Sequence, residues 1–339
     1  MTNGSNQYVL SGLRPTGRVH LGNYFGAVRN WVRLQDQYRC FYFVADWHAL
    51  TSDYADPSQI TQSTFEAVAD WLAAGLDPEK CTIFVQSQVK EHAELHLLLS
   101  MVTPLPWLER VPTFKEQQAQ LVEKDLNTYG FLGYPLLQTA DIIVYRANSV
   151  PVGEDQASHL EISREIVRRF NNFYGPVFPE PQALFTETPK VPGLDGRKMS
   201  KSYGNTIGLT ASADEIRTLT ASMFTDPNRI RRKDPGNPDI CNLFQFHKLF
   251  SDPETVNRVD HECRTAMIGC VDDKKLLAEI MIEALAPIRA RREEIDRNPD
   301  MVWEILRRGN VAARERAAET LALVRKAMKL DYAGLLDQP

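Results

Sequence analysis

The chain has 339 residues, of which 43% are hydrophobic, and its 39 basic and 44 acidic side chains give a formal net charge of −5. This composition excludes disordered and fibrous classes, and domains of roughly 100–200 residues would make it about two domains. Five cysteines without a C-x-x-C pair argue against a secreted disulfide framework. No apolar run approaches the roughly 18 residues of a membrane span, and no signal pattern opens the chain, so we expect a soluble cytoplasmic protein without membrane partners. The acidic balance does not by itself suggest a nucleic-acid partner.

The first third of the chain alternates between strand and helix patterns. Short apolar runs predict buried strands at Tyr8–Gly12, Cys40–Val44 and Thr82–Gln86. Helical spacing of apolar residues predicts helices over Gly22–Gln37 and Pro57–Gly75. Strands separated by helices imply parallel pairing, so we expect an α/β fold with a doubly wound, Rossmann-like parallel sheet.

The rest of the chain is mostly helical. Residues 91–169 have helical patterns interrupted by prolines and by a turn near Val150–Gly153, and a loop-rich stretch holds a candidate strand at Leu184–Thr186. Helix-like spacing recurs at Glu215–Phe224, Leu243–Phe250, Lys274–Arg292 and Val311–Met328. We therefore expect a nucleotide-binding domain at residues 1–205 and an all-helical C-terminal domain at 206–339.

The segment Ser11–Asn23 (SGLRPTGRVHLGN) lies where the first strand passes to the first helix. In parallel sheets this turn lies at the carboxyl ends of the strands, where nucleotides bind. Gly22 and Asn23 would offer unpaired N–H groups to an anion, and His20 adds a further donor. There is no G-x-G-x-x-G, which disfavours a dinucleotide enzyme. Alone, the segment fits a glycine-rich turn with a surface histidine equally well.

The segment Gly196–Asn205 (GRKMSKSYGN) carries two lysines three residues apart, Lys198 and Lys201. Lysine is a flexible point charge that suits phosphates, and the flanking glycines and serines favour mobility. The segment therefore indicates a phosphate clamp, whereas in isolation it fits a solvated basic loop.

Together the two segments resemble those of class I aminoacyl-tRNA synthetases. His20-Leu21-Gly22-Asn23 resembles the HIGH signature, and the run from Lys198 to Ser202 matches KMSKS. The runs YPLLQTADIIVY (Tyr134–Tyr145) and VGEDQ (Val152–Gln156) are similar to the bacterial tryptophanyl branch, and the similarity covers essentially the whole chain. The resemblance implies ATP-dependent activation of L-tryptophan and its transfer to tRNA(Trp). It also implies a homodimer with a helical insert at about 104–150, and an anticodon-binding role for residues 206–339.

The resemblance also implies roles for individual residues. Catalysis would rest on His20, Asn23, Lys198 and Lys201. ATP, with Mg²⁺ on its triphosphate, would contact Arg14, Pro15, Thr16, Gly22, Asn23, Gly153, Glu154, Asp155, Val191, Lys198, Met199, Ser200, Lys201 and Ser202. Tryptophan would be bound by Asp141, which reads the indole N–H, and by Tyr134, Gln138, His48 and Gln156. Gln138 departs from the methionine of some relatives, and Asp141 alone would fit a helix residue paired with Arg146.

Two related activities are the alternatives. A tyrosyl enzyme shares the fold, but its relatives often have G-x-D-Q where this chain has G-E-D-Q at Gly153–Gln156. That run, and the lack of a separate RNA-binding tail, favour tryptophan. A nucleotidyltransferase of the same superfamily would lack the helical domain. The intact His20, Lys198, Lys201 and Asp141 argue against a silent paralogue.

Three cysteines of the helical region, Cys241, Cys263 and Cys270, raise the question of a cluster. Some relatives bind [4Fe–4S] with four cysteines here, whereas Asp273 takes the fourth position in this chain. Because such clusters normally use four thiolates, a labile cluster, another metal and a remnant all remain open. His92 and His96 have helical i, i+4 spacing but no clear third ligand, which favours a structural role over zinc.

Two basic groups could contact RNA. One comprises Arg229, Arg231, Arg232 and Lys233, and the other Arg289, Arg291 and Arg292. A solvated loop is the default interpretation of such runs. The resemblance adds phosphate contacts with tRNA as an expectation.

Overall fold

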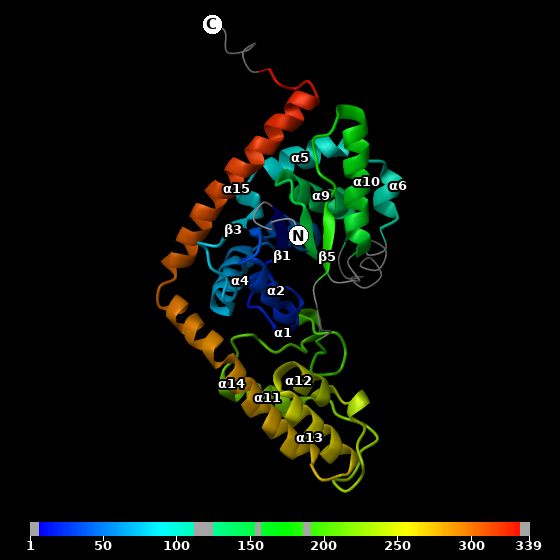
Figure 1. The fold of residues 1–339 in the computed structure, drawn as a ribbon, viewed down its shortest axis with the longest axis vertical. Helices are drawn as coiled ribbons and strands as arrows, with labels where there is room; N and C mark the ends of the chain where they lie inside the picture. Colours follow the sequence, from blue (N-terminus) through cyan, green and yellow to red (C-terminus); the bar gives the residue numbers. More distant parts are fainter. Residues whose placement is uncertain (1–6, 112–124, 153–156, 186–190, 333–339) are drawn as a thin grey trace.

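The computed structural model describes residues 7–111, 125–152, 157–185 and 191–332. Its centre is a parallel five-stranded sheet of order β3-β2-β1-β4-β5 (Figure 1). The strands are β1 (Tyr8–Leu13), β2 (Arg39–Val44), β3 (Cys81–Val85), β4 (Ser149–Val152) and β5 (Gln182–Phe185). The strand order reverses between β1 and β4, and ligands of such sheets bind beside that point at the carboxyl ends of the strands. The expected doubly wound α/β fold is confirmed.

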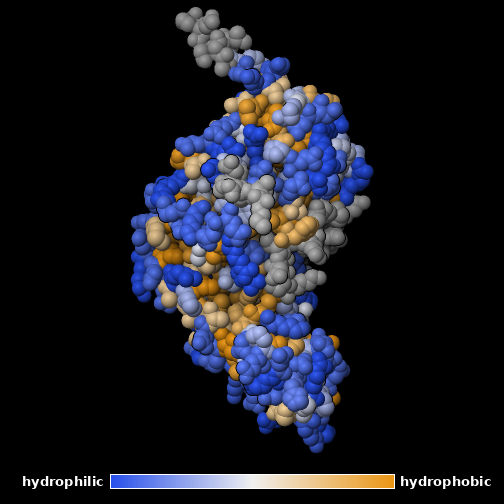
Figure 2. Space-filling view, in the orientation of Figure 1, coloured by the Kyte–Doolittle hydropathy of each residue, from blue (hydrophilic) through white to orange (hydrophobic). Residues whose placement is uncertain are grey.

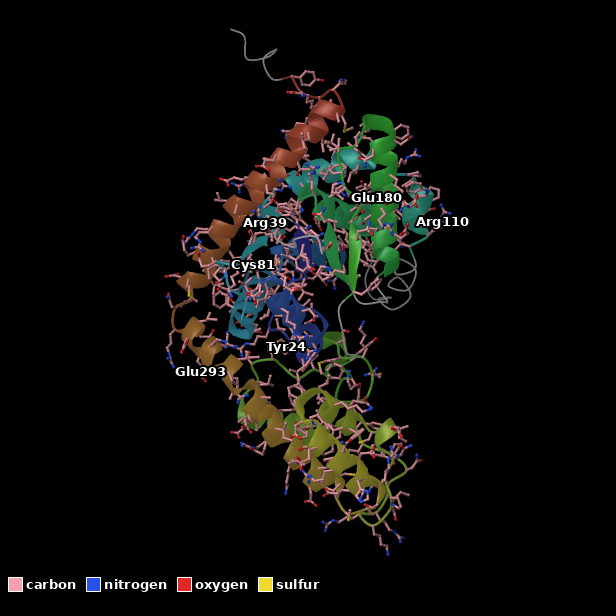
Figure 3. The ribbon with its side chains drawn as sticks, viewed as in Figure 1. Tyr24, Arg39, Cys81, Arg110, Glu180 and Glu293 are labelled. Carbon is pink, nitrogen blue, oxygen red and sulfur yellow. The ribbon has the colours of Figure 1, made fainter. Side chains whose placement is uncertain are left out.

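Both faces of the sheet are buried, which explains the continuous apolar runs of its strands. Along β2, Tyr42 and Val44 belong to one core cluster, while Phe41 and Phe43 point to the other. Figure 3 marks Arg39 and Cys81 at the first residues of the neighbouring strands β2 and β3. Alternate residues therefore anchor helices on opposite faces.

Helices cover the two faces of the sheet. One face carries α1 (Leu21–Asn23), the π-helical turn η2 (Tyr24–Val28), α2 (Arg29–Leu34) and α4 (Ile60–Ala74). The other carries α5 (Glu91–Ser100), α9 (Tyr134–Val144) and α10 (Ala157–Tyr174). Short helices complete this part: α3 (Asp46–Asp53), η3 (Gln86–Gln88), α6 (Leu105–Glu109) and α8 (Tyr129–Leu132).

The turn expected near Val150–Gly153 is wrong for its described residues, because Ser149–Val152 form β4. This strand pairs with β1 through Val9 and Ser149, and along its length with β5. Four residues that include a proline give little periodic signal, so the strand is defined by its neighbours rather than by its own sequence. The strand expected at Leu184–Thr186 is confirmed in β5, shifted toward the N-terminus.

The C-terminal third is helical, as expected. It comprises the short η5 (Lys201–Tyr203) and η6 (Pro238–Ile240) and the helices α11 (Ala213–Ser222), α12 (Asn242–Phe250), α13 (Pro253–Arg264), α14 (Cys270–Asp296) and α15 (Asp300–Ala327). Helices α11–α14 form the lower part of Figure 1, and α15 runs back along the sheet-containing part. A Cβ on Gly309 of α15 would lie 1.8 Å from the carbonyl oxygen of Ile83, and Asn310 Oδ1 accepts the Val85 N–H at 2.9 Å. Helix α15 thus covers the edge strand β3, which would otherwise expose unpaired backbone groups.

The surface is mixed in character. Figure 2 shows hydrophobic residues near the middle of this face, where the sheet-containing part meets the C-terminal helices. None of the helices in the described part of the chain is long and apolar enough to cross a membrane.

Candidate active site

His20 lies in the connection that follows β1 and caps α1. Its ring is buried, and Nδ1 accepts the backbone N–H of Asn23 at 3.3 Å. Burial, with a smaller contribution from the charge of Lys201, lowers the pKa of His20 to about 4. The ring is therefore neutral near pH 7, and because Nδ1 accepts a hydrogen bond, Nε2 carries the proton.

The 198–202 segment packs directly against the His20 segment. Gly22 and Met199, which are in contact, are 177 positions apart in the sequence. Met199 is buried, and its Sδ accepts the Gly22 N–H at 3.3 Å. Lys201 Nζ donates to the carbonyl oxygens of Thr16 and Arg18. Burial lowers the pKa of Lys201, against the opposing charges of Asp70 and Glu66. The structure thus brings together the two segments that the sequence singled out.

The backbone N–H groups at the start of α1 are engaged, in contrast to the expectation of unpaired donors. The Gly22 N–H binds Met199, the Asn23 N–H binds His20, and the Leu21 N–H binds the carbonyl oxygen of Ile207 at 2.9 Å. A Cβ on Gly22 would lie 2.9 Å from the His20 ring. Glycine at this position therefore permits close packing. An anion that binds here must replace the groups that now accept hydrogen bonds from these N–H donors.

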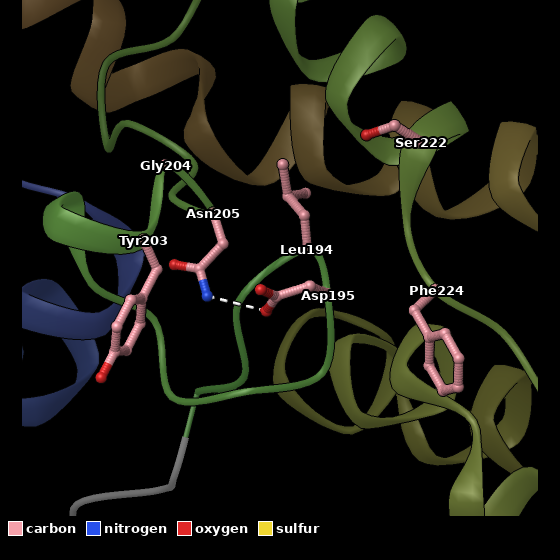
Figure 4. A pocket seen from close by; sticks show the side chains of 7 residues that line it. All are labelled: Leu194, Asp195, Tyr203, Gly204, Asn205, Ser222 and Phe224. Carbon is pink, nitrogen blue, oxygen red and sulfur yellow. Dashed lines mark hydrogen bonds between the residues drawn. The ribbon is translucent and has the colours of Figure 1, made fainter.

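Asn205 shapes the loop that carries the two lysines. Its Oδ1 accepts the Ser200 N–H at 2.9 Å, and its Nδ2 donates to Asp195 at 2.8 Å and to the Lys198 carbonyl at 3.2 Å. Figure 4 shows Asn205 and Asp195 in an open pocket, the remaining lining residues being Leu194, Tyr203, Gly204, Ser222 and Phe224. A Cβ on Gly193 would lie 2.1 Å from Asn205 Nδ2, so the loop closes around this amide.

The other expected nucleotide contacts are distributed around this junction. Val191 is buried and its carbonyl accepts the Met199 N–H at 3.4 Å, which places it against the lysine segment. Arg14 and Thr16 are exposed, Pro15 is buried, and Arg14 Nη1 donates to Ser52 Oγ at 3.1 Å. Lys198 and Ser202 are exposed. The predicted residues Gly153, Glu154, Asp155 and Gln156 lie outside the described residues.

Asp141, on α9, is buried and accepts hydrogen bonds from three side chains. Gln86 Nε2 donates to Oδ1 at 2.8 Å, and His92 Nδ1 lies 2.6 Å from the same oxygen. His48 Nε2 lies 2.7 Å from Oδ2. Burial raises the pKa of Asp141, but the hydrogen bonds from His48 and His92 outweigh it, and the net pKa is well below the usual range. These partners, rather than Arg146, hold the carboxylate ionised.

The remaining expected tryptophan residues share a helix face with Asp141. Tyr134 and Gln138 are half-buried and precede Asp141 by seven and three positions, so they lie on one side of α9. His48 reaches Asp141 from α3. Sequence reasoning missed Gln86 and Tyr145 and assigned His92 no site role. The signal for His92 was its helical spacing to His96, which is uninformative about Asp141. Both His92 nitrogens are engaged by Asp141 and Tyr145, which leaves neither for zinc.

The cysteine cluster does not fit an iron–sulfur centre. Arg229 Nη1 lies 3.8 Å from the Sγ atoms of both Cys263 and Cys270, and Asp273 Oδ1 lies 3.1 Å from His247 Nε2. Burial raises the pKa of Cys263 to about 11, although the charge of Arg229 opposes this. A guanidinium thus stands among the thiols, and no set of three or more histidine, cysteine or acidic residues within the described ranges is placed to hold a metal.

The two basic groups differ in exposure. Arg231, Arg232 and Lys233 are exposed on the loop between α11 and α12, as a surface contact requires. The second group is mixed, because Arg291 is exposed and Arg289 is partly buried, whereas Arg292 is buried. Arg292 is 3% exposed and pairs with Asp70, Glu66 and Asp296, while Arg291 Nε donates to the Ala73 carbonyl at 2.6 Å.

Known proteins are similar to this chain in both sequence and fold. The family model of class I tRNA synthetases (W and Y) matches residues 2–286. The tryptophan–tRNA ligase of Thermotoga maritima is 53% identical over 96% of this chain and 99% of the relative, and that of Aquifex aeolicus is 43% identical over 95% and 99%. The tryptophanyl-tRNA synthetase of Campylobacter jejuni, solved with ADP and tryptophan, has a TM-score of 0.85 at 35% identity and covers 95% of this chain and 99% of its own.

A doubly wound sheet with the His20 and Lys198–Ser202 segments packed at its carboxyl edge defines a class I tRNA synthetase. Within that class, the chain belongs to the tryptophan–tRNA ligase family. The resemblance noted from the sequence is confirmed. A tyrosyl-tRNA synthetase of Archaeoglobus fulgidus, 19% identical with a TM-score of 0.65, shares the fold alone.

Proposed function

We propose that this chain activates L-tryptophan with MgATP to tryptophanyl-adenylate and transfers it to tRNA(Trp). The observation that carries the proposal is the convergence of functional segments at one edge of the sheet. His20 follows β1, His48 follows β2 and Gln86 follows β3, each beyond the carboxyl end of its strand. Ligands of open parallel sheets bind at this edge.

The first chemical step needs positioning more than proton transfer. The tryptophan carboxylate is already ionised at neutral pH and attacks the α-phosphorus of ATP, expelling pyrophosphate. Charge stabilisation on the leaving group is then the main demand. Lys201 supports this role because it holds two backbone carbonyls, Thr16 and Arg18, that it can exchange for phosphate oxygens. Lys198 is exposed three residues earlier on the same loop and would join it.

The nucleotide site would be assembled around the docked segments. Asn23 and neutral His20 would face the phosphates, since the Nε2–H of His20 remains a donor while Nδ1 is used. The residues that we assign to ATP are Arg14, Pro15, Thr16, Gly22, Asn23, Gly153, Glu154, Asp155, Val191, Lys198, Met199, Ser200, Lys201 and Ser202. Mg²⁺ would enter as part of the MgATP substrate.

The amino-acid site would be centred on Asp141. An indole has a single N–H donor and no acceptor, so a buried ionised carboxylate suits it. Tyr134 and Gln138, on the same side of α9, and His48 and Gln156 would complete the pocket. A phenol hydroxyl both donates and accepts hydrogen bonds, whereas an ionised carboxylate only accepts them. Asp141 therefore matches the donor-only indole better, which favours tryptophan over tyrosine.

The remaining assignments concern the whole chain. We propose a catalytic domain at 1–205 and an anticodon-binding region at 206–339. We also propose a homodimer that uses the helical insert at about 104–150. The cytoplasm is the expected compartment, since the relatives are tRNA-charging enzymes.

The test is amino-acid-dependent ATP–pyrophosphate exchange with tryptophan, tyrosine and phenylalanine. We expect exchange with tryptophan alone. Lys201→Met should lower it by at least about a hundredfold, the scale of removing one transition-state charge contact. Lys248→Met is the matched control, since Lys248 lies over the Phe244 ring on α12 and should have little effect. Exchange with tyrosine alone would contradict the substrate, and exchange with none of the three would contradict the activity.

A further inference from the structure

Among the described residues three side chains donate to Asp141, and they leave one acceptor position of its carboxylate open. A carboxylate offers about four lone-pair positions, two on each oxygen. Gln86 and His92 take both positions of Oδ1, and His48 takes one of Oδ2. Gln86 and His92 are fully buried, whereas the His48 side chain is 13% exposed. The open position is therefore on the oxygen beside the one donor that is partly exposed.

His92 is held from behind by a second buried group. Its Nε2 lies 2.7 Å from the hydroxyl of Tyr145, the residue that caps the end of α9. The Tyr145 ring is stacked on Phe41 at a centroid distance of 4.8 Å, and the His92 ring lies 6.1 Å from Phe84. Burial, with smaller contributions from Asp141 and Glu91, raises the pKa of Tyr145 well above its ordinary value, so the hydroxyl keeps its proton.

This pairing determines which nitrogen of His92 carries hydrogen. A neutral imidazole has one N–H and one acceptor nitrogen, and its tautomer is set by the partner of the second nitrogen. A Tyr145 hydroxyl that donates to Nε2 leaves the hydrogen on Nδ1, which then donates to Asp141 Oδ1. In the other tautomer a lone pair would face the carboxylate, which is repulsive and would turn Asp141 away from its position.

We propose that Tyr145 and His92 are positioning residues for tryptophan recognition, which fix Asp141 so that its Oδ2 accepts the indole N–H. The inference rests on the proposed role of Asp141 and assigns two residues that the substrate does not touch. Gln86 assists by donating to the same oxygen as His92. Discrimination for the N–H group thus depends on a chain of contacts from α9 through α5 and back to α9.

The experiment compares tryptophan with β-(3-benzothienyl)alanine, in which sulfur replaces the indole N–H. The KM of tryptophan in pyrophosphate exchange and the Ki of the analogue as a competitor are measured at pH 8. Tyr145→Phe and His92→Leu should weaken tryptophan about tenfold or more, the scale of a charge-assisted hydrogen bond. The Ki of the analogue should change by less than about twofold, because it makes no such bond.

Two further variants separate positioning from folding. His92→Asn places an amide N–H near the position of Nδ1 and should restore most of the tryptophan affinity that His92→Leu loses. Tyr42→Phe removes another buried hydroxyl, which donates to the Trp31 carbonyl at 3.1 Å, and should leave the KM-to-Ki ratio unchanged. Thermal melts report folding for each variant, and Tyr145→Phe keeps the test valid if His92→Leu does not fold.

The outcomes distinguish the inference from the function on which it rests. Equal weakening of tryptophan and analogue by Tyr145→Phe would overturn the positioning role and leave a purely structural one. A wild-type enzyme that binds the analogue as well as tryptophan would overturn the role of Asp141 itself. A selective loss of tryptophan affinity, with rescue by His92→Asn, is the expected result.

Discussion

Burial is used in opposite ways by two residues of this site. His20 is kept neutral because burial disfavours its charged form, whereas Asp141 is kept charged because three donors outweigh the same effect. Both pKa values are lowered, but the first shift produces a neutral donor where we propose that the phosphates bind, and the second a charged acceptor where we propose that the indole binds. The partners, not the burial alone, decide which form of the side chain the site uses.

The neutral state of His20 makes stability depend on pH. Its folded pKa of about 4 lies below the unfolded value of 6.5, so the unfolded chain binds more protons between these values. The contribution of this group to the free energy of unfolding is fully present above pH 6.5. It is lost as the pH falls toward 4, and the total loss is about 3 kcal/mol. Denaturant unfolding from pH 4 to 7 should show a shallower slope for His20→Asn, whose amide oxygen can still cap Asn23. Parallel pH curves would contradict the buried neutral ring.

The cysteine cluster leads to a prediction about metal content. Because Arg229 donates toward Cys263 and Cys270, a cluster would have to displace a partly buried guanidinium that also binds the Ile268 carbonyl at 2.7 Å. Protein purified without oxygen should therefore contain far less than one iron and one acid-labile sulfide per chain, and should be fully active in exchange. Stoichiometric iron and sulfide would contradict the arrangement.

At the scale of elements, one buried arginine joins the C-terminal helices to the His20 segment. Arg292 of α14 pairs with Asp70 and Glu66 of α4 at 2.5 Å each. Asp70 also accepts the backbone N–H of Val19 at 2.7 Å and the hydroxyl of Thr210 at 3.3 Å. Because Val19 precedes His20, the position of the His20 segment depends on how α14 packs against α4.

Removing Arg292 should therefore affect both stability and nucleotide binding. Arg292→Met leaves Asp70 as an uncompensated buried charge, which lowers the free energy of unfolding by about 3–5 kcal/mol. We expect the KM for ATP in exchange to rise severalfold while the KM for tryptophan is retained. The matched control is Arg217→Met, which breaks an exposed ion pair between α11 and Glu279 of α14. This variant should change both measurements little. Equal effects of the two variants on stability, or an unchanged KM for ATP, would contradict the coupling.

The sequence was informative where structure is local. Short continuous apolar runs predicted β1, β2 and β3 because both faces of each strand are buried, and the spacing within Leu243–Phe250 predicted α12. It failed at β4, which exists because β1 and β5 lie beside it. For the candidate site, motif matching identified His20 and Lys201, but no local pattern links Gln86 or Tyr145 to Asp141. Those contacts depend on how α5, α9 and β3 pack, which a single sequence does not specify.

At the scale of the molecule, the sheet-containing part and the exposed basic loop lie far apart. The loop between α11 and α12 is in the lower part of Figure 1, away from the sheet, and α14 and α15 run between the two regions. Figure 2 shows the same lower part dominated by hydrophilic residues. A large RNA can span such a distance, so in the proposed function one substrate would contact both ends, while ATP and tryptophan would contact only one.

The division of labour predicts a selective defect when the basic loop is neutralised. Arg231 and Arg232 are exposed, and only Arg232 makes an ion pair within the described residues, with Asp272 at 3.2 Å. Phosphate contacts from these residues would hold the RNA without touching the small substrates. Arg231→Ala with Arg232→Ala should therefore raise the KM for tRNA severalfold, leave tryptophan-dependent exchange intact, and weaken the salt dependence of charging, because fewer counterions are released on binding.

The matched control replaces Arg297 and Arg307, exposed arginines near the bend between α14 and α15, and should leave all three measurements unchanged. Loss of exchange in the loop variant would instead assign these arginines a role in folding.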